Sequence, residues 1–263
     1  MPNVLQQRFD PPHSPDGQPG FAQQAADALP EWDLNDLYPG MRGPEIEADF
    51  AAAGTAARAF HGAYAGKLGA LSGAELATAL GEYQRVEEIQ GRLMSYAQLQ
   101  FSADSTDPAI GQFYQSVNER VTAISTNLLF FTLELNRLDD AALDAKFADP
   151  ALLRWRPWLR DLRVFRPHQL SDELEKLLHE KEVTGRGAWG RLFDETVAGM
   201  RVPLRGEELT VSAALNKLSD RDRAVRADAA AAIGDAFSRN IRLFSLVTNT
   251  LVKDKEIIDT WRA

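Results

Sequence analysis

The stretch of this sequence that comes nearest to a catalytic motif is LLHEKEV, residues 177–183. His179 and Glu180 begin the pattern His-Glu-x-x-His, in which two imidazoles one helical turn apart bind one zinc ion while the glutamate polarises the attacking water. Val183 stands where the second histidine would be needed. The segment therefore lacks one of the two ligands, and the pattern favours an ordinary helix over a zinc site.

The other candidate metal ligands are scattered along the chain. His13, His61 and His168 have no histidine four residues away, and the sequence contains no cysteine. A thiolate metal site, a disulfide and a cysteine nucleophile are therefore excluded. A metal site would have to be assembled from distant segments, and a histidine such as His168 more often bonds a backbone carbonyl or faces water.

A glycine pattern follows directly, because GRGAWG at residues 185–190 fits G-x-G-x-x-G. In a dinucleotide site these glycines let the backbone approach a pyrophosphate at a helix N-terminus, and the motif must follow a strand. Here the helical pattern DELEKLLHEKEV precedes it. We therefore expect a flexible connection between helices and no bound nucleotide.

No further catalytic set is present. The chain has neither a G-x-S-x-G nucleophile elbow nor a Walker loop, and the acidic pairs Glu87-Glu88 and Asp139-Asp140 occupy positions typical of solvated helix surfaces. We predict no catalytic, cofactor-binding or metal-binding residue within these 263 residues.

Composition limits the function classes. The net charge of −9 and a pI near 5.0 argue against nucleic acid, since phosphate contacts need a surplus of Lys and Arg. No stretch approaches the roughly 20 consecutive apolar residues of a membrane helix, and residues 1–28 lack the apolar core of a signal peptide. We expect a soluble cytoplasmic protein.

Local signals predict a mostly α fold, an antiparallel array of long helices. Residues 1–28 are rich in Pro, Gln and Gly and are expected to be disordered, while Trp32, Leu34, Leu37 and Tyr38 are expected to dock as an apolar patch. Helices are predicted from Pro44 to Tyr64, after a Ser72 cap, and from Pro108 to Leu135. The last has an unbroken four-three apolar stripe, for which packing within the chain is favoured over a coiled-coil partner.

Shorter elements are predicted next. Helices begin at Asp139, at Asp149-Pro150 with Pro157 bending or ending it, and at Ser171. One β-hairpin near 197–211 turns at Arg205-Gly206, with Pro203 confined to an edge or a bulge. A final helix is expected to run from Ser219 to about Thr260.

Five segments in one order carry a family resemblance. WDLNDLYPG at 32–40 resembles the segment that opens the fold of oligoendopeptidase F-type zinc metallopeptidases, relatives of thimet oligopeptidase. Four more blocks follow: LLFFTLELNRLDDAAL at 128–143, LRVFRPHQLSDELEKLL at 162–178, GAWGRLFDETVAGMRVPLRGEELTVSAALNKLSDRDRAVRADAA at 187–230 and NTLVKDKEIIDTWRA at 249–263.

This resemblance implies a helical peptidase whose deep channel admits short peptides, with zinc held by His-Glu-x-x-His and a further downstream Glu. The motif Glu would be the general base, and later His or Tyr residues would stabilise the oxyanion. None of these has a matching position here, so the chain is similar to the N-terminal portion of such an enzyme. We expect a helical unit at 29–183 and, at 184–263, the start of the peptidase fold.

Three functions follow as hypotheses. The chain is the scaffold and channel portion of a zinc oligoendopeptidase, inactive alone and completed by a C-terminal catalytic region, or it is a free-standing helical module that binds peptide or protein. A nucleotide-binding enzyme is the third. The first predicts apolar surface left exposed on long helices, whereas the second predicts a well-covered, monodisperse protein.

Overall fold

The computed structural model of the chain describes residues 33–263. Within that range the chain is mostly helical and has a single two-stranded antiparallel sheet, which confirms the predicted fold class. The predictions for residues 1–28 and for Trp32 lie outside the described residues. Of those described, no helix is long and apolar enough to cross a membrane.

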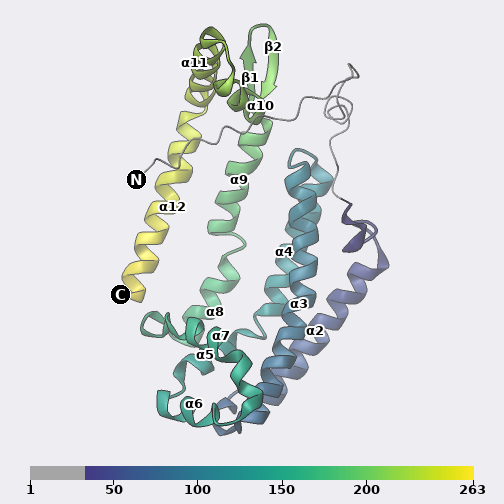
Figure 1. Cartoon of the computed structure of the whole chain (residues 1–263), viewed down its shortest axis with the longest axis vertical. Coiled ribbons are helices and arrows are strands. Elements are labelled where there is room, and N and C mark those ends of the chain that lie inside the picture. Colours follow the sequence, from purple (N-terminus) through teal and green to yellow (C-terminus); the bar gives the residue numbers. More distant parts are fainter. Residues whose placement is uncertain (1–32) are drawn as a thin grey trace, which may run out of the picture.

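Three long helices form one side of the molecule (Figure 1): α2 (Pro44–Tyr64), α3 (Gly73–Ala103) and α4 (Pro108–Ser125). Each begins as predicted, with Pro44 and Pro108 in the first turns of α2 and α4 and a capping box between Ser72 and Glu75 at α3. A short 3-10 turn, η2 (Leu68–Ala70), joins α2 to α3. Local capping chemistry thus fixes where these helices start.

The prediction of one helix from Pro108 to Leu135 is wrong. The helix ends at Ser125, and α5 (Leu129–Arg137) starts after a turn. The hydroxyls of Ser125 and Thr126 donate to the Thr122 carbonyl, and the Asn127 amide donates to the carbonyls of Ala123 and Ile124. Three successive side chains therefore compete for the carbonyls of one helical turn. The apolar stripe continues across the break because apolar residues recur wherever the chain faces the core, whether or not the helix is continuous.

Two hydrophobic clusters hold this side together. The first joins α2, α3 and α5 with the segment that follows them, around the fully buried Phe131, whose ring centroid lies 5.0 Å from that of Phe60 and 4.9 Å from that of Tyr83. In the second, Val117 of α4 is buried with Phe50 of α2 and Leu93 of α3. The stripe of α4 therefore packs within the chain, as predicted.

The segment at 33–40 docks on the second cluster. It contains the 3-10 turn η1 (Leu34–Asp36), capped by Asp33, and ends in the buried Tyr38. The Tyr38 hydroxyl donates to Asp49 at 2.5 Å and accepts from Arg92 at 3.2 Å, while Arg92 also pairs with Asp49. Burial, together with the hydrogen bond to Asp49, raises the pKa of Tyr38 to about 12. Docking of this segment is thus confirmed for its described part.

Short elements cross the end of the molecule that lies farthest from the hairpin (Figure 1): α6 (Asp140–Lys146), η3 (Pro150–Trp155), α7 (Arg156–Arg163), η4 (Arg166–His168) and α8 (Asp172–Lys181). Asp139, Asp149 and Ser171 cap α6, η3 and α8 as predicted. Pro157 stands in the first turn of α7, so it opens a new helix directly after the 3-10 turn ends.

The predicted flexible connection at 185–190 is wrong, because α9 (Arg186–Gly199) begins inside it. Gly185 and Gly187 are required by close packing in the turn from α8. A Cβ atom on Gly185 would lie 2.9 Å from the Lys181 carbonyl oxygen, and one on Gly187 would lie 2.9 Å from that of Glu182. The glycines therefore allow two helices to follow each other tightly.

The predicted hairpin is present as β1 (Arg201–Leu204) and β2 (Glu207–Thr210). Arg205 and Gly206 have φ of 52° and 92°, the positive values of the expected tight turn. Pro203 lies opposite Glu208 in a sheet where both strands are edges. Val202 is fully buried and packs with residues of α10 (Val211–Asn216) in a third cluster.

The single final helix from Ser219 to Thr260 is also wrong. A 3-10 turn, η5 (Lys217–Ser219), precedes α11 (Arg223–Arg239), and α12 (Ile241–Arg262) follows after Asn240. The Asn240 side chain donates to the Ala236 carbonyl at the end of α11. Phe244 then returns to Phe237, with 5.4 Å between ring centroids, so the apolar period continues across the turn. From there α12 runs back along α9 (Figure 1).

Candidate functional site

His179, the nearest approach to a zinc ligand, links two helices. Its Nε2 lies 2.8 Å from the Ser125 hydroxyl oxygen, at the end of α4. That hydroxyl also lies 3.1 Å from the Thr122 carbonyl oxygen, to which it donates its proton. The serine oxygen therefore accepts from the histidine, whereas a nucleophilic serine would have to donate to it. The contact joins α4 to α8.

The remaining histidines are dispersed. His168 Nδ1 lies 2.9 Å from the Arg262 carbonyl oxygen, and the His61 ring packs edge-on against Phe130 at 5.0 Å. His13 lies outside the described residues. Between residues 33 and 263 no three His, Cys, Asp or Glu side chains come together in a way that could hold a metal ion. The residues described thus do not provide the donor set of a zinc site.

The glycine motif and the acidic pairs have structural surroundings. Helix α8 precedes Gly185, so the strand required by a dinucleotide site is not the element in front of the motif. Glu87 and Glu88 are exposed on α3. Asp139 caps α6, and Asp140 accepts from Arg163 at 2.5 Å and from Arg166 at 3.0 Å.

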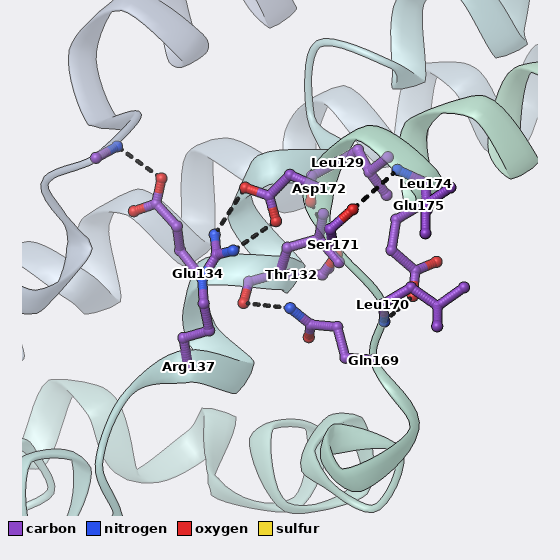
Figure 2. A network of polar contacts seen from close by, with 12 residues as sticks. Leu129, Thr132, Glu134, Arg137, Gln169, Leu170, Ser171, Asp172, Leu174 and Glu175 are labelled. Atoms are coloured by element: carbon purple, nitrogen blue, oxygen red, sulfur yellow. Dashed lines mark hydrogen bonds and ion pairs between the residues drawn. The ribbon is translucent and has the colours of Figure 1, made fainter. Parts of the chain in front are cut away.

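Polar side chains make several contacts at the junction of α5 and α8 (Figure 2). Arg137 makes a two-pronged ion pair with Asp172, with nitrogen–oxygen distances of 2.5 and 3.0 Å. Gln169 donates to the Leu133 carbonyl at 3.2 Å, and Glu134 accepts from the Gly66 amide at 2.6 Å. These contacts fix α5 against the start of α8 and against the turn after α2.

The end of α12 is bound to the same junction. Arg262 donates to both carboxylate oxygens of Glu175, at 2.6 and 2.8 Å, and to the His168 carbonyl at 3.0 Å. Glu175 also accepts from the Leu170 amide at 2.9 Å, as Figure 2 shows. The hydrogen bond from Arg262 holds the pKa of Glu175 below its usual range. Sequence analysis missed this pair because nothing local relates residues 87 positions apart.

Much of α12 is nevertheless uncovered. Its single buried residue is Val247, and it packs along α9. Leu246, Ile257 and Trp261 are 54%, 48% and 63% exposed. Ile257 and Trp261 follow Leu246 by 11 and 15 residues, a spacing that places all three on one helix face. We name these three residues the α12 stripe. Thr250 and Lys253 lie between Leu246 and Ile257 on this face, so only Ile257 and Trp261, one helical turn apart, form a continuous apolar surface of the kind that packs against a partner.

Comparison with known proteins decides what this frame resembles. Residues 134–201 match the sequence model of the oligopeptidase F family. The resemblance to oligoendopeptidase F-type proteins is thereby confirmed. No curated protein matches the chain.

Two solved structures resemble the fold. Oligoendopeptidase-F from Enterococcus faecium superposes with a TM-score of 0.71 at 18% identity, over 83% of this chain and 43% of that one. A candidate peptidase from Chlamydophila abortus has a TM-score of 0.49 at 16% identity, over 88% of this chain and 40% of that one. The chain thus spans less than half the length of each.

The oligopeptidase F match falls on the junction described above. Residues 134–201 contain Arg137, Asp172 and Glu175 and the elements from α6 to α9. Helices α2 to α4 precede it, and the hairpin and α12 follow it. The family signal therefore coincides with the frame on which α12 is fixed.

Proposed function

We propose that this chain is the N-terminal scaffold of a zinc-dependent oligoendopeptidase that hydrolyses peptide bonds in short peptides. In this proposal α2 to α12 form one wall of a substrate channel. A C-terminal catalytic region supplies the zinc ligands and the general base. The chain alone neither binds stoichiometric zinc nor cleaves peptides.

The observation that carries the proposal is the position of the oligopeptidase F match on the α5–α9 frame. That frame connects α5 with the end of α12, because α8 is bound to α5 by the ion pair Arg137–Asp172 and to α12 by the ion pair Glu175–Arg262. A rigid frame that holds a long helix with an uncovered apolar face suits a scaffold for a further packed region.

The α12 stripe supports the same proposal over a free-standing binding module. A module that functions by itself is expected to cover the apolar face of its last long helix. If the module hypothesis holds, the purified chain is monodisperse and does not bind a hydrophobic dye. If the scaffold hypothesis holds, the dye binds and substitution of Trp261 reduces the signal.

The test of the chemistry uses quenched fluorescent oligopeptides and metal analysis. We expect the purified chain to release no fluorescence and to contain no stoichiometric zinc after dialysis. Cleavage by the chain that a chelator abolishes, together with one bound zinc per chain, would contradict the proposal that the chemistry resides in another region.

The organisation at 29–183 and 184–263, and a cytoplasmic location, belong to the same proposal. Limited proteolysis tests the organisation, since cleavage concentrated near residues 182–187 is expected if the two parts are separate units. Cleavage that instead begins within α2 to α4 would argue against this division.

A further inference from the structure

Exposed apolar side chains lie at the end of the molecule farthest from the hairpin, around α7 and the turn that follows it (Figure 1). Leu153, Val164 and Phe165 are 48%, 65% and 70% exposed, and Phe165 is the most exposed large apolar residue between residues 33 and 263. None of the three belongs to the α5–α8–α12 junction or to the α12 stripe. Apolar side chains exposed together in this way mark an interaction surface.

A groove of about 700 Å³ opens beside these residues, between α6, η3 and α7. Leu153 and Val164 form part of its wall, so two of the three exposed residues border the groove itself. Phe165 directly follows Val164 and is not among the residues that line the groove. One surface therefore combines a hollow with an exposed aromatic side chain next to it.

A nearly buried arginine holds this surface in place. The Arg163 side chain is only 10% exposed, and it donates to the carbonyls of Leu135 and Leu138 at 2.5 and 2.6 Å and to Asp140 at 2.5 Å. These bonds fix α7 relative to α5 and α6. The exposed residues therefore follow a braced helix, and a braced surface loses little conformational freedom when it binds.

Charges of both signs border the groove without an ion-pair partner among residues 33–263. Arg156 is exposed, with its guanidinium carbon 5.0 Å from the centre of the Phe147 ring, and Asp144 is exposed on α6. Neither residue takes part in any ion pair within that range. The other charged side chains of the groove are already paired: Asp140, Arg160 and Arg163.

These features suit a second copy of the same chain. In a twofold dimer one surface is used twice, so it must be complementary to itself. A hollow beside an exposed aromatic residue meets that condition, and so does an unpaired arginine near an unpaired aspartate. An anionic lipid surface suits it less, because the exposed carboxylates of Asp140 and Asp144 would face the lipid phosphates.

We propose that this surface joins two copies of the chain in a twofold dimer. Phe165 of each copy fills the groove of the other and covers the exposed parts of Leu153 and Val164. Arg156 of each copy binds Asp144 of the other, so the dimer contains two such pairs. The proposal is independent of the proposed function, because it uses no residue of the α5–α8–α12 junction or of the α12 stripe and requires no catalysis.

The first test is the mass of the full chain in sedimentation equilibrium at rising concentration. We expect the mass to increase from 29.1 kDa toward twice that value. Phe165→Ser should weaken the dimer by about a hundredfold or more, because one substitution removes two aromatic anchors. Trp261→Gln changes a similarly exposed aromatic residue of the α12 stripe and is the matched control, which should leave the dissociation constant unchanged.

Charge reversal tests whether the ion pairs form between copies. Arg156→Asp and Asp144→Arg should each weaken self-association by about tenfold or more, because each places like charges opposite one another in both pairs. When the two variants are mixed, both pairs regain opposite charges, so a heterodimer should form about as tightly as the wild-type dimer. Fluorescence transfer between differently labelled variants measures this recovery. Arg242→Asp, at an exposed position in the first turn of α12, is the charge control and should leave self-association unchanged.

Three results would overturn the proposal. They are a mass that stays at 29.1 kDa at every concentration, a loss in Phe165→Ser no greater than that in Trp261→Gln, and no recovery when the charge-reversed variants are mixed. In the first case, flotation of the chain with anionic vesicles would identify a lipid surface as the occupant instead. All substituted residues are exposed, so the fold should persist, and circular dichroism checks that it does.

Discussion

The two sides of the molecule differ in how far their cores are completed. Helices α2 to α5 surround fully buried large side chains such as Phe131, Leu80 and Leu93. On the other side α8 and α9 contain no buried residue and α12 contains only Val247. The first side thus stabilises itself by burial, whereas the second is held by the hairpin cluster and by ion pairs at the junction. The proposed scaffold function predicts this difference, because a further region would pack against the side that is less buried.

The largest loss of stability is expected on the completed side, which is formed by α2 to α5. Phe131→Ala removes a ring packed between Phe60 and Tyr83 and should cost about 3–5 kcal/mol in the free energy of unfolding. Val247→Ala removes the much smaller side chain of the single buried residue of α12 and should cost only about 1–2 kcal/mol. Denaturant unfolding measures both. A cost for Val247→Ala equal to that for Phe131→Ala would remove the contrast between the two sides.

The next largest loss of stability is expected when the ion pair at the end of α12 is weakened. Glu175→Gln weakens the two-pronged bond to Arg262 and should cost about 1–2 kcal/mol, seen as faster hydrogen exchange of the last turns of α12. The control is Asp259→Asn, which removes an exposed pair with Lys255 and should cost at most about 0.5 kcal/mol. Similar exchange in both variants would mean that Glu175 does not fix α12.

The same pair predicts a pH dependence. Because the Glu175 pKa is lowered in the folded state, its contribution is fully present above the unfolded value of about 4.3 and is lost as pH falls through the lower folded pKa. The stability difference between wild type and Glu175→Gln should therefore be constant near neutral pH and vanish in acid. A difference that persists at pH 2 would show that the charge of Glu175 is not its source.

A smaller loss of stability is expected from a change at Tyr38, which attaches the segment 33–40 to α2 and α3. Tyr38→Phe removes one hydrogen bond to Asp49 and should cost about 1 kcal/mol. Since the Tyr38 pKa is raised to about 12, this contribution is present below pH 10 and is lost as pH rises through the folded value. Tyr114→Phe, at a hydroxyl without a hydrogen-bond partner among residues 33–263, is the control and should be near neutral.

The smallest expected change in stability is on the α12 stripe. Trp261→Gln alters a side chain that is 63% exposed and should change the free energy of unfolding by at most about 0.5 kcal/mol. It should nevertheless reduce binding of a hydrophobic dye by the chain. Unchanged dye binding would show that the stripe is not the apolar surface in question, and the argument from α12 would fail.

Local rules predicted the beginnings of the elements well. Ser72, Asp107, Asp139 and Ser171 cap the helices expected of them, because a cap depends on a few neighbouring residues. The turn at Arg205-Gly206 followed from the same kind of signal. The breaks at Ser125 and Asn240 were missed because the apolar period survives a turn when the next helix packs back on the same cluster.

The junction could not have been predicted from the sequence. Glu175 and Arg262, or Arg137 and Asp172, meet only after several helices are placed, and neither pair carries a local pattern. The glycines at 185 and 187 were misread as flexible because their role is a close approach to carbonyls of the preceding turn. The family resemblance was recognisable because ordered sequence blocks do not require the tertiary contacts to be known.

The most direct test of the central claim compares two preparations in one peptidase assay. One is the 263-residue chain produced alone, and the other is the polypeptide captured from its native source with an antibody to this chain, with its intact mass determined. We predict that the chain alone is inactive and that the native polypeptide is much heavier than 29.1 kDa and cleaves short peptides until a chelator is added. A native polypeptide of about 29.1 kDa without peptidase activity would contradict the scaffold account and favour a binding module.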